Sequence, residues 1–203
     1  MNETYSSTYD NQNMISNDPW AITYIPSRVA KFEVVSRQQY NDSIDKLIEK
    51  EVELTYVMDN EDIELPVRGT EQSAGYDFVS PISFKLAPGE QIIIPTGIRC
   101  KMYNNYVLML YPRSSVGIKH NISFANTTPI IDSDYYNAKN EGHILLAFKN
   151  SNKRSWRHKK NVENTWVVNA GDRICQGIIL QYGITMDDNA NNKRIGGIGS
   201  TGA

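Results

Sequence analysis

Short apolar runs separated by turn residues dominate the chain from Leu65 onward, and this rhythm constrains the fold more than any other feature. Each run has the length and alternation of a β-strand rather than the period of an amphipathic helix. Segments such as APGE, YNN and NAGD separate the runs and favour turns. Many short strands joined by turns are typical of a sandwich or barrel, so we predict an all-β fold. The runs are YDFVS, QIIIPTGIRC, YVLMLYP, PIIDSDYY, HILLAFK, TWVVNA and RICQGIILQYGI.

The first 64 residues differ from the rest of the chain in charge. They hold 13 Asp and Glu against 5 Lys and Arg, a net charge of −8, whereas residues 65–203 hold 10 against 16, a net charge of +6. Residues 1–30 offer few aliphatic side chains to offset the entropy of ordering, so we expect a polar, largely disordered tail. We assign residues 31–64 to an N-terminal strand and helix extension, an appendage to a β domain at residues 65–190.

One short helix is expected inside this extension. Ser36 precedes Gln39 by three residues, which is the capping-box pattern of a helix start. The preceding segment, WAITYIPSRVAKFEVV, is compatible with a strand or with an extended arm. The apolar side chains that then recur at helical spacing are Tyr40, Ile44, Leu47 and Ile48.

The sequence excludes several classes of protein. No apolar run approaches the roughly 18 residues that span a bilayer, and the first thirty residues lack a basic start followed by an apolar stretch. A pI near 5.9 argues against a bulk nucleic-acid binder. We therefore expect a soluble protein of the cytoplasm, or of the infected host's cytoplasm if the chain is viral, with no membrane partner.

The cysteines and histidines point away from a disulfide and from a structural metal. Cys100 and Cys175 lie inside apolar, strand-like runs, where a buried free thiol is favoured over a disulfide or a nucleophile. His120, His143 and His158 are widely separated, and no Cys or His pair has the close spacing of a zinc site.

Five polar segments have the composition of ligand-binding loops set on a β scaffold. SAGYDF bends into a strand, and YPRSSVG places a guanidinium and two hydroxyls after one, donors that suit phosphate oxygens. In IIDSDYYN two carboxylates and a tyrosine crowd a turn. They are either solvated turn formers, which the residues alone favour, or they include a general base. AGDRICQGIILQ puts a glutamine in an apolar strand, and KRIGGIGSTGA is either a frayed end or a phosphate cradle.

In this order, the segments AGYD, PRSS, IIDSDY, GDRICQG and GGIGSTG resemble the five motifs of the homotrimeric dUTPase family, and its phage and Firmicute branch is the most similar. The resemblance covers residues from about 65 to the C-terminus. It implies jelly-roll subunits that form homotrimers with shared active sites and hydrolyse dUTP to dUMP and pyrophosphate. It also implies Mg²⁺ as cofactor, held by triphosphate oxygens and water rather than by a protein cage. Residues 191–203 become an arm that closes over the substrate.

The resemblance assigns roles to the matching residues. Asp132 falls on the catalytic aspartate, which deprotonates a water for in-line attack on the α-phosphorus. Asn126 falls on the residue that reads the polar edge of uracil, and Tyr135 on the aromatic beneath the deoxyribose. Asp77 is given a supporting role. The residues at or beside the family's other substrate-contacting positions are Arg113, Ser114, Ser115, Gln176, Lys193, Arg194, Ile198, Gly199, Ser200 and Thr201.

Some positions depart from the family pattern. Ser115 and Pro129 stand where glycine is usual, and Ile198 replaces a phenylalanine that stacks on the base, so we predict weaker closure over the substrate. Lys193 occupies the usual place of the arm's arginine, three residues before the paired glycines, and Arg194 lies one residue later. We favour Arg194 for the γ-phosphate because its planar fork suits phosphate.

Two other functions stay open. A dCTP deaminase shares the fold, although GGIGSTG and the IIDSDY aspartate favour a pyrophosphatase. The second is a non-enzymatic module, in which the N-terminal extension or the basic run 149–161 binds a regulatory protein and nucleotide only gates that contact. A solvated hairpin tip is the favoured interpretation of the basic run, since exposed loops commonly carry charge, and the resemblance requires no nucleic acid there.

Overall fold

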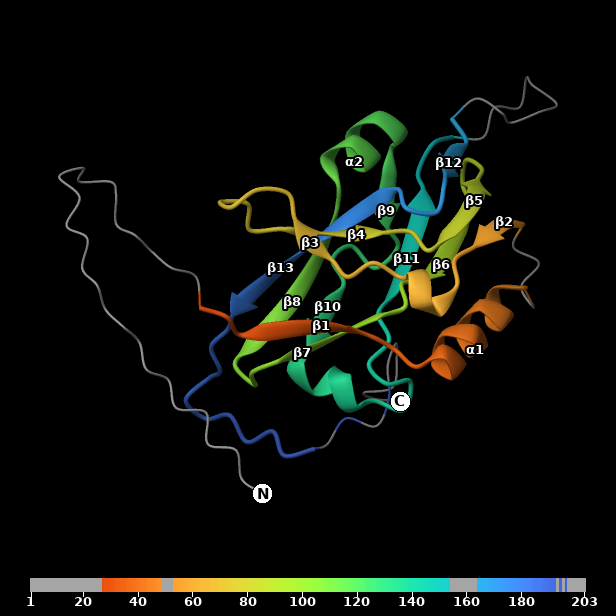
Figure 1. Ribbon diagram of the computed structural model, residues 1–203. Helices are drawn as coiled ribbons and strands as arrows, with labels where there is room; N and C mark the ends of the chain where they lie inside the picture. Colours follow the sequence, from red (N-terminus) through yellow and green to blue (C-terminus); the bar gives the residue numbers. More distant parts are fainter. Residues whose placement is uncertain (1–26, 49–52, 154–163, 193, 195, 197–203) are drawn as a thin grey trace.

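Strands make up most of the regular secondary structure of the described chain (Figure 1). The computed structural model describes residues 27–48, 53–153, 164–192, 194 and 196. The predicted all-β fold is confirmed. The strands are β1 (Ala30–Val34), β2 (Leu54–Val57), β3 (Val67–Arg68), β4 (Tyr76–Val79), β5 (Ile82–Leu86), β6 (Gln91–Pro95), β7 (Ile98–Met102), β8 (Tyr106–Pro112), β9 (Ile122–Phe124), β10 (Ile130–Asp132), β11 (Leu145–Asn150), β12 (Trp166–Val168) and β13 (Arg173–Gln181). The helices are α1 (Arg37–Ile48), α2 (Ser114–His120) and the 3-10 helices η1 (Asn60–Asp62) and η2 (Ser133–Asn137).

Antiparallel sheets surround a shared apolar core. The largest has the strand order β10-β8-β13-β4-β3, and smaller sheets have the orders β6-β11-β9, β12-β5-β2 and β1-β7. Inside, Trp166 packs edge to face on Phe84 and Phe148, with ring centroids 5.5 and 5.2 Å apart. Truncating a core aromatic of this kind to alanine costs about 3–5 kcal/mol. This core gives the polar loops between the strands a rigid support.

The apolar runs locate most strands but miss some boundaries. The run QIIIPTGIRC forms two strands because the chain turns at Gly97, whose φ is 74°. A Cβ at Gly97 would lie 2.2 Å from Ile63 Cδ1, so a larger residue does not fit. The turn passes the chain from β6, which pairs with β11, to β7, which pairs with β1. Strands β2, β3, β5 and β9 and helix α2 lie outside the predicted runs. The seven residues of α2 are too few to show a helical period.

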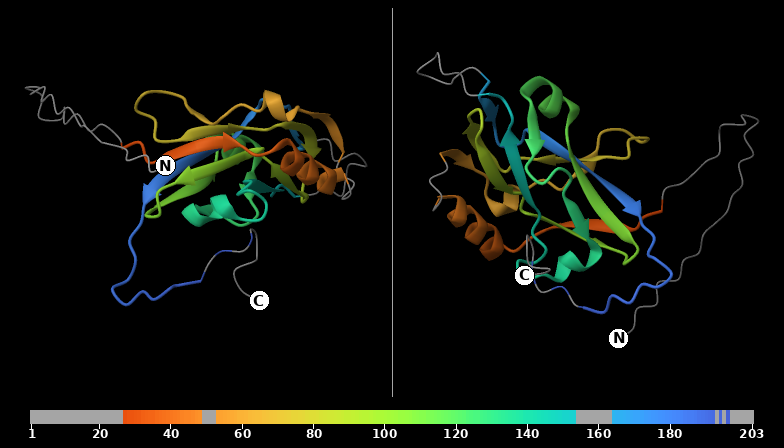
Figure 2. Two further views of the ribbon diagram at one scale, coloured as in Figure 1. Left: turned by 60° about the horizontal axis from the view of Figure 1, so that its bottom comes forward. Right: turned by 180° about the vertical axis from the view of Figure 1, so that it is seen from behind.

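The described part of residues 31–64, which the sequence suggests to be an appendage, packs into the same core as the β domain (Figure 2). β1 pairs with β7, and β2 pairs with β5. Helix α1 buries Tyr40, Ile44 and Leu47, whereas Ile48 at its end is 59% exposed. A helix of this length is marginal alone, so its stability comes from this packed face.

The start of α1 forms half of the predicted capping box. The Gln39 backbone N–H donates to Ser36 Oγ at 3.2 Å. The return bond from the Gln39 side chain is replaced, because the Ser36 backbone N–H donates to Glu141 Oε2 at 2.8 Å and Gln39 Nε2 donates to Ser43 Oγ instead. The helix start is thus tied to a distant loop.

The remaining predictions concern the cysteines, membrane spans, the N-terminal tail and the basic run. Cys100 and Cys175 are buried free thiols, as predicted, and burial raises the pKa of Cys100 to about 12. Among the described residues, no helix is long and apolar enough to cross a membrane. Most of the predicted tail (residues 1–26) and of the basic run (154–161) lies outside the described residues.

Candidate active site

The candidate site residues lie toward opposite ends of β8. Asp132 is opposite Val107 near the start of the strand, whereas Gln176 is opposite Tyr111 near its end, and Arg113 follows the strand directly. Four residues of antiparallel strand span about 14 Å. One chain therefore holds two separate groups. We call Asp77, Arg113, Arg173 and Gln176 the donor cluster, and Asp132, Asp134, Tyr135 and Arg194 the carboxylate cluster.

In the donor cluster, Asp77 orients two guanidinium groups. Asp77 on β4 is opposite Gln176 on β13. Its carboxylate accepts from Arg173 Nη1 at 3.1 Å and forms an ion pair with Arg113 Nε at 3.4 Å. The Asp77 side chain is only 14% exposed, and this largely buried carboxylate has two cationic partners, Arg113 and Arg173. The sequence motifs did not predict a site role for Arg173, whose link to Asp77 follows from the β4–β13 register.

Gly75 allows the Gln176 amide to approach the backbone. A Cβ at Gly75 would lie 2.5 Å from Gln176 Oε1 and 3.3 Å from its Cδ. This close approach, rather than an unusual φ, explains the glycine at the bend before β4. Gln176 is half-buried in β13, opposite Asp77 of the donor cluster, and its amide supplies a neutral donor.

A hollow of about 440 Å³ opens beside the donor cluster. Arg113 is the N-cap residue of α2, with an extended backbone, and its N–H donates to the Ile174 carbonyl at 3.4 Å. Ser114 and Ser115 begin α2 and are exposed, so their hydroxyls are accessible from solvent. Guanidinium and hydroxyl groups are suitable donors for phosphate oxygens. The hollow is lined by Arg113, Ser115, Val116, His120, Trp166, Val167, Val168, Gly171, Asp172, Arg173 and Ile174.

In the carboxylate cluster, the Arg194 guanidinium bridges two acids. Its Nη2 contacts Asp132 Oδ2, and its Nε donates to Asp134 Oδ1 at 2.7 Å. Its Cζ lies 5.8 Å from the centroid of the Tyr135 ring. Asp132 ends β10, while Asp134 and Tyr135 follow on η2. Within one chain, Arg194, which we expect to bind the γ-phosphate, thus contacts Asp132, the predicted catalytic aspartate.

Tyr135 is held by its hydroxyl. The phenol donates to the His143 carbonyl at 2.8 Å and accepts from Asn140 Nδ2 at 2.8 Å. The side chain is buried, and burial raises its pKa. Tyr135 therefore stays protonated and offers a rigid apolar ring. The sequence does not predict that Asn140 and the His143 carbonyl bond the Tyr135 hydroxyl, since no local pattern marks either residue.

Asn126 lies in an exposed turn ahead of β10. Thr127 next to it has φ 67°, and the Thr128 N–H donates to the Asn126 carbonyl at 2.8 Å. Pro129, which departs from the family pattern, is buried, and its carbonyl accepts from the Leu110 N–H at 3.1 Å. A proline is tolerated because this backbone position acts only as an acceptor.

Comparison with known proteins identifies the family. A dUTPase family model matches residues 61–202. The chain belongs to the dUTPase family. The deoxyuridine 5'-triphosphate nucleotidohydrolase of Lactococcus lactis is 37% identical over 147 residues, which cover 71% of this dUTPase and 91% of the relative. That of Methylobacillus flagellatus is 34% identical over 146 residues, covering 68% and 87%.

Solved structures agree with the jelly-roll fold. The dUTPase from Streptococcus mutans superimposes with a TM-score of 0.55 at 30% identity, covering 76% of this chain and 97% of that chain. A dUTPase from phage phi11 of S. aureus gives a TM-score of 0.57 at 20% identity, covering 80% and 96%. The predicted resemblance to Firmicute and phage dUTPases is confirmed.

Part of the predicted site of this dUTPase lies outside the described residues. Of the arm, only Arg194 and Gly196 are described beyond residue 192. The predicted arm residues outside the described part are Lys193, Ile198, Gly199, Ser200 and Thr201.

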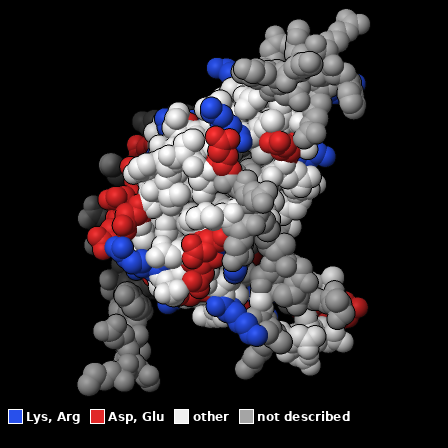
Figure 3. All heavy atoms as spheres, turned by 90° about the vertical axis from the view of Figure 1, so that its right-hand side faces the viewer, with Lys and Arg blue, Asp and Glu red and all other residues white. Residues whose placement is uncertain are grey.

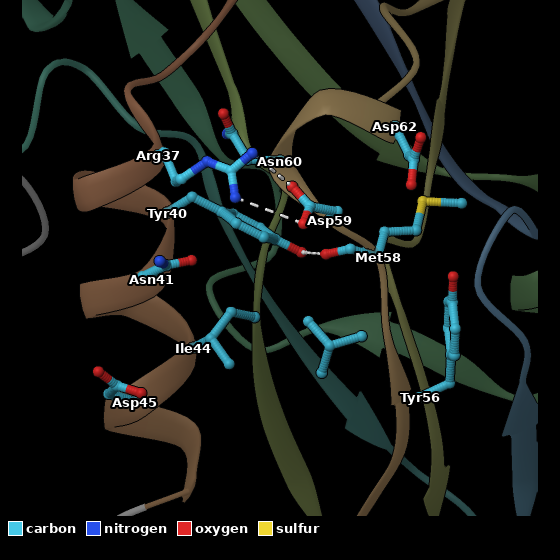
Figure 4. A pocket seen from close by; sticks show the side chains of 11 residues that line it. Arg37, Tyr40, Asn41, Ile44, Asp45, Tyr56, Met58, Asp59, Asn60 and Asp62 are labelled. Atoms are coloured by element: carbon cyan, nitrogen blue, oxygen red, sulfur yellow. Dashed lines mark hydrogen bonds and ion pairs between the residues drawn. The ribbon is translucent and has the colours of Figure 1, made fainter.

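A second hollow of this dUTPase, of about 500 Å³, lies between α1, β2 and η1, and it contains none of the predicted site residues (Figure 4). Arg37 reaches across to Asp59, and the Tyr40 hydroxyl donates to the Met58 carbonyl at 3.3 Å. Figure 3 shows acidic side chains interspersed with basic ones on the side of the molecule seen in that view. The hollow is lined by Arg37, Tyr40, Asn41, Ile44, Asp45, Tyr56, Val57, Met58, Asp59, Asn60 and Asp62.

Proposed function

We propose that this dUTPase hydrolyses dUTP to dUMP and pyrophosphate, with Asp132 as the general base. The observation that carries the proposal is the carboxylate cluster: Asp132 ends a strand of the rigid sheet, and its side chain is 47% exposed. The Cζ atom of Arg194, which contacts the Asp132 carboxylate, lies 5.8 Å from the centroid of the Tyr135 ring. The Asp132 carboxylate is thus accessible to a water yet fixed in direction. Asp132 would take a proton from that water as the water oxygen attacks the α-phosphorus. The bond to the bridging oxygen then breaks, and pyrophosphate leaves with the electron pair.

The donor cluster would bind the phosphate chain. Arg113 offers a planar fork held by Asp77, the hydroxyls of Ser114 and Ser115 lie next to it, and Gln176 adds an amide donor. These groups suit a triphosphate whose remaining charge a divalent cation shares. Mg²⁺ on triphosphate oxygens and water would neutralise charge that develops on the phosphates. We assign Asn126 to the uracil edge and the Tyr135 ring to the face of the deoxyribose.

Arg194 would exchange partners when substrate binds. In the chain alone its guanidinium neutralises Asp132 and Asp134. A γ-phosphate offers a stronger anionic partner for the same fork. If Arg194 moves to the phosphate, the Asp132 carboxylate becomes free to bind water.

The division of the site favours an oligomer. The donor and carboxylate clusters lie about 14 Å apart along β8, so a single copy does not bring Asp132 to a phosphate bound at Arg113. A second copy can place its carboxylate cluster against the first copy's donor cluster. Ile130 and Leu180 on the main sheet are 58% and 42% exposed and offer apolar surface for such a contact. We propose a homotrimer with shared active sites.

Asp132→Asn tests the chemistry. The asparagine keeps the shape of the side chain but accepts no proton, so we expect dUTP turnover to fall by about 10²–10⁴-fold. Binding of a non-hydrolysable dUTP analogue should stay within a few-fold. Pyrophosphate and ammonia release are measured with dUTP and dCTP as substrates. Ammonia released from dCTP would show a deaminase instead, and near-normal turnover by the variant would show that Asp132 is not the base.

A further inference from the structure

The loop that carries Asp134 and Tyr135 has little local support. η2 is a five-residue 3-10 helix, which has poor hydrogen-bond geometry, and its N-cap residue Asp132 makes no side-chain capping bond. Tertiary contacts must therefore hold it. Three of these contacts come from residues 33–43, which precede the family match at residues 61–202.

The first contact joins β1 to η2. The Tyr136 hydroxyl donates to Glu33 Oε2 at 2.6 Å, and this hydrogen bond is the largest cause that lowers the pKa of Glu33. Arg99 completes the contact, because its Nη2 lies 3.1 Å from Glu33 Oε2 and its Cζ lies 4.5 Å from the Tyr136 ring centroid. The end of η2 is thereby fixed to β1 and β7.

The other two contacts join α1 to the segment after η2. The Ser36 backbone N–H and Oγ donate to the two Glu141 carboxylate oxygens at 2.8 and 2.6 Å. Ser43 Oγ lies 3.1 Å from Nδ1 of the fully buried His143. The Gly97 N–H donates to His143 Nε2 at 2.8 Å, so Nδ1 carries the ring proton and donates to Ser43.

These contacts are connected to the candidate active site through the Tyr135 hydroxyl. The His143 carbonyl accepts the Tyr135 hydroxyl, and Asn140 donates to the same hydroxyl. Whatever fixes His143 and the loop around it therefore also fixes Tyr135.

We propose that Glu33, Ser36 and Ser43 are positioning residues for hydrolysis. They hold the loop so that the Tyr135 ring and the Asp132 carboxylate keep a fixed relation to the substrate. Residues 33–43 thus hold the carboxylate cluster in place, and we call their three contacts with residues 136–143 the brace. This inference rests on the roles of Asp132 and Tyr135 in the proposed function.

The test removes the brace while leaving the cap of α1 intact. Tyr136→Phe deletes the hydroxyl that bonds Glu33, and Glu141→Gln weakens the pair of bonds from Ser36. Because small displacements of a catalytic group are costly, we expect kcat to fall about ten-fold in each variant and further in the double variant, with KM within about two-fold. Hydrogen exchange of the backbone amides in residues 133–143 should become faster in the same variants, whatever the activity.

Two controls separate positioning from stability. Tyr40→Phe removes the bond from α1 to the Met58 carbonyl, on a contact with β2 rather than η2, and should leave kcat and the exchange of residues 133–143 unchanged. Glu33→Gln keeps an acceptor for Tyr136 and should stay closer to wild-type kcat than Glu33→Ala.

The outcomes distinguish the two proposals. Unchanged kcat and unchanged exchange in the Tyr136→Phe/Glu141→Gln variant would overturn the brace while leaving the proposed function standing. An equal loss of kcat in Tyr40→Phe would also overturn it, since the effect would then follow stability. If wild-type protein released no pyrophosphate from dUTP, the proposed function would fail, and the exchange measurement would still decide whether the brace exists.

Discussion

Among single residues, Gly75 shapes the site because its missing side chain makes room for the Gln176 amide. The amide lies against Gly75, at a separation that leaves no room for a methyl group. The clash would fall on the far end of the glutamine side chain rather than on backbone, so the fold can adapt by moving the amide. Glycine at position 75 therefore allows the close approach of the Gln176 amide.

Gly75→Ala should therefore impair substrate binding more than stability. We expect the displaced Gln176 amide to raise KM for dUTP about ten-fold, with a change of less than about 1 kcal/mol in the free energy of unfolding. Steady-state kinetics and urea unfolding measure both. Gly69→Ala is the matched control, because a Cβ at Gly69 meets no atom within 4 Å. Equal KM values for the two variants would contradict the role given to Gln176.

At the scale of elements, helix α1 docks through a histidine that must remain neutral. His143 is fully buried, accepts from Gly97 through Nε2 and faces Ser43 with Nδ1. Burial is the main reason that its pKa falls to about 4, from 6.5, and the Glu141 carboxylate opposes this shift. A proton on Nε2 would place two donors against each other.

Stability should consequently depend on pH through His143. The unfolded chain binds a proton at higher pH than the native chain does, so the contribution is complete above pH 6.5 and is lost as the pH falls toward about 4. Its full size is roughly 3 kcal/mol. Urea unfolding between pH 7 and 5 should show the slope in wild type and in His120→Gln, whose histidine is exposed. Under the same conditions His143→Gln should lose most of it; an unchanged slope in that variant would contradict the assignment.

At the scale of the whole molecule, the order of strands keeps the two halves of the site apart. β8 lies between β10 and β13, so it places the carboxylate cluster and the donor cluster along its own length. Loop motion does not close that gap, because both clusters are attached to the same rigid sheet. In the proposed homotrimer, a second copy would supply the missing cluster.

Mixing two inactive variants tests this arrangement. Asp132→Asn lacks the base and Arg113→Ala lacks a phosphate contact, so each alone should be nearly inactive. If the site is shared between copies, refolding the two together in equal amounts restores intact sites in about a quarter of positions by random assembly. dUTP turnover by the mixture is compared with that of each variant refolded alone. No gain on mixing would show that both residues act within one chain, and sedimentation would report the number of copies.

Features that depend on neighbours along the chain can be predicted from the amino-acid sequence alone. Alternating apolar runs predict the all-β fold, and Ser36 with the residues after it predicts α1. Five ordered motifs identify the family, and they predict site roles for Asp132, Arg113 and Gln176. The contacts between distant groups become visible only in the folded chain. The ion pairs of Asp77, the contact of Arg194 with Asp132 and the brace from Glu33 to Tyr136 join residues of different strands and loops. Strand pairing and core packing create such contacts between residues far apart in the sequence, and no local pattern specifies which distant residues meet.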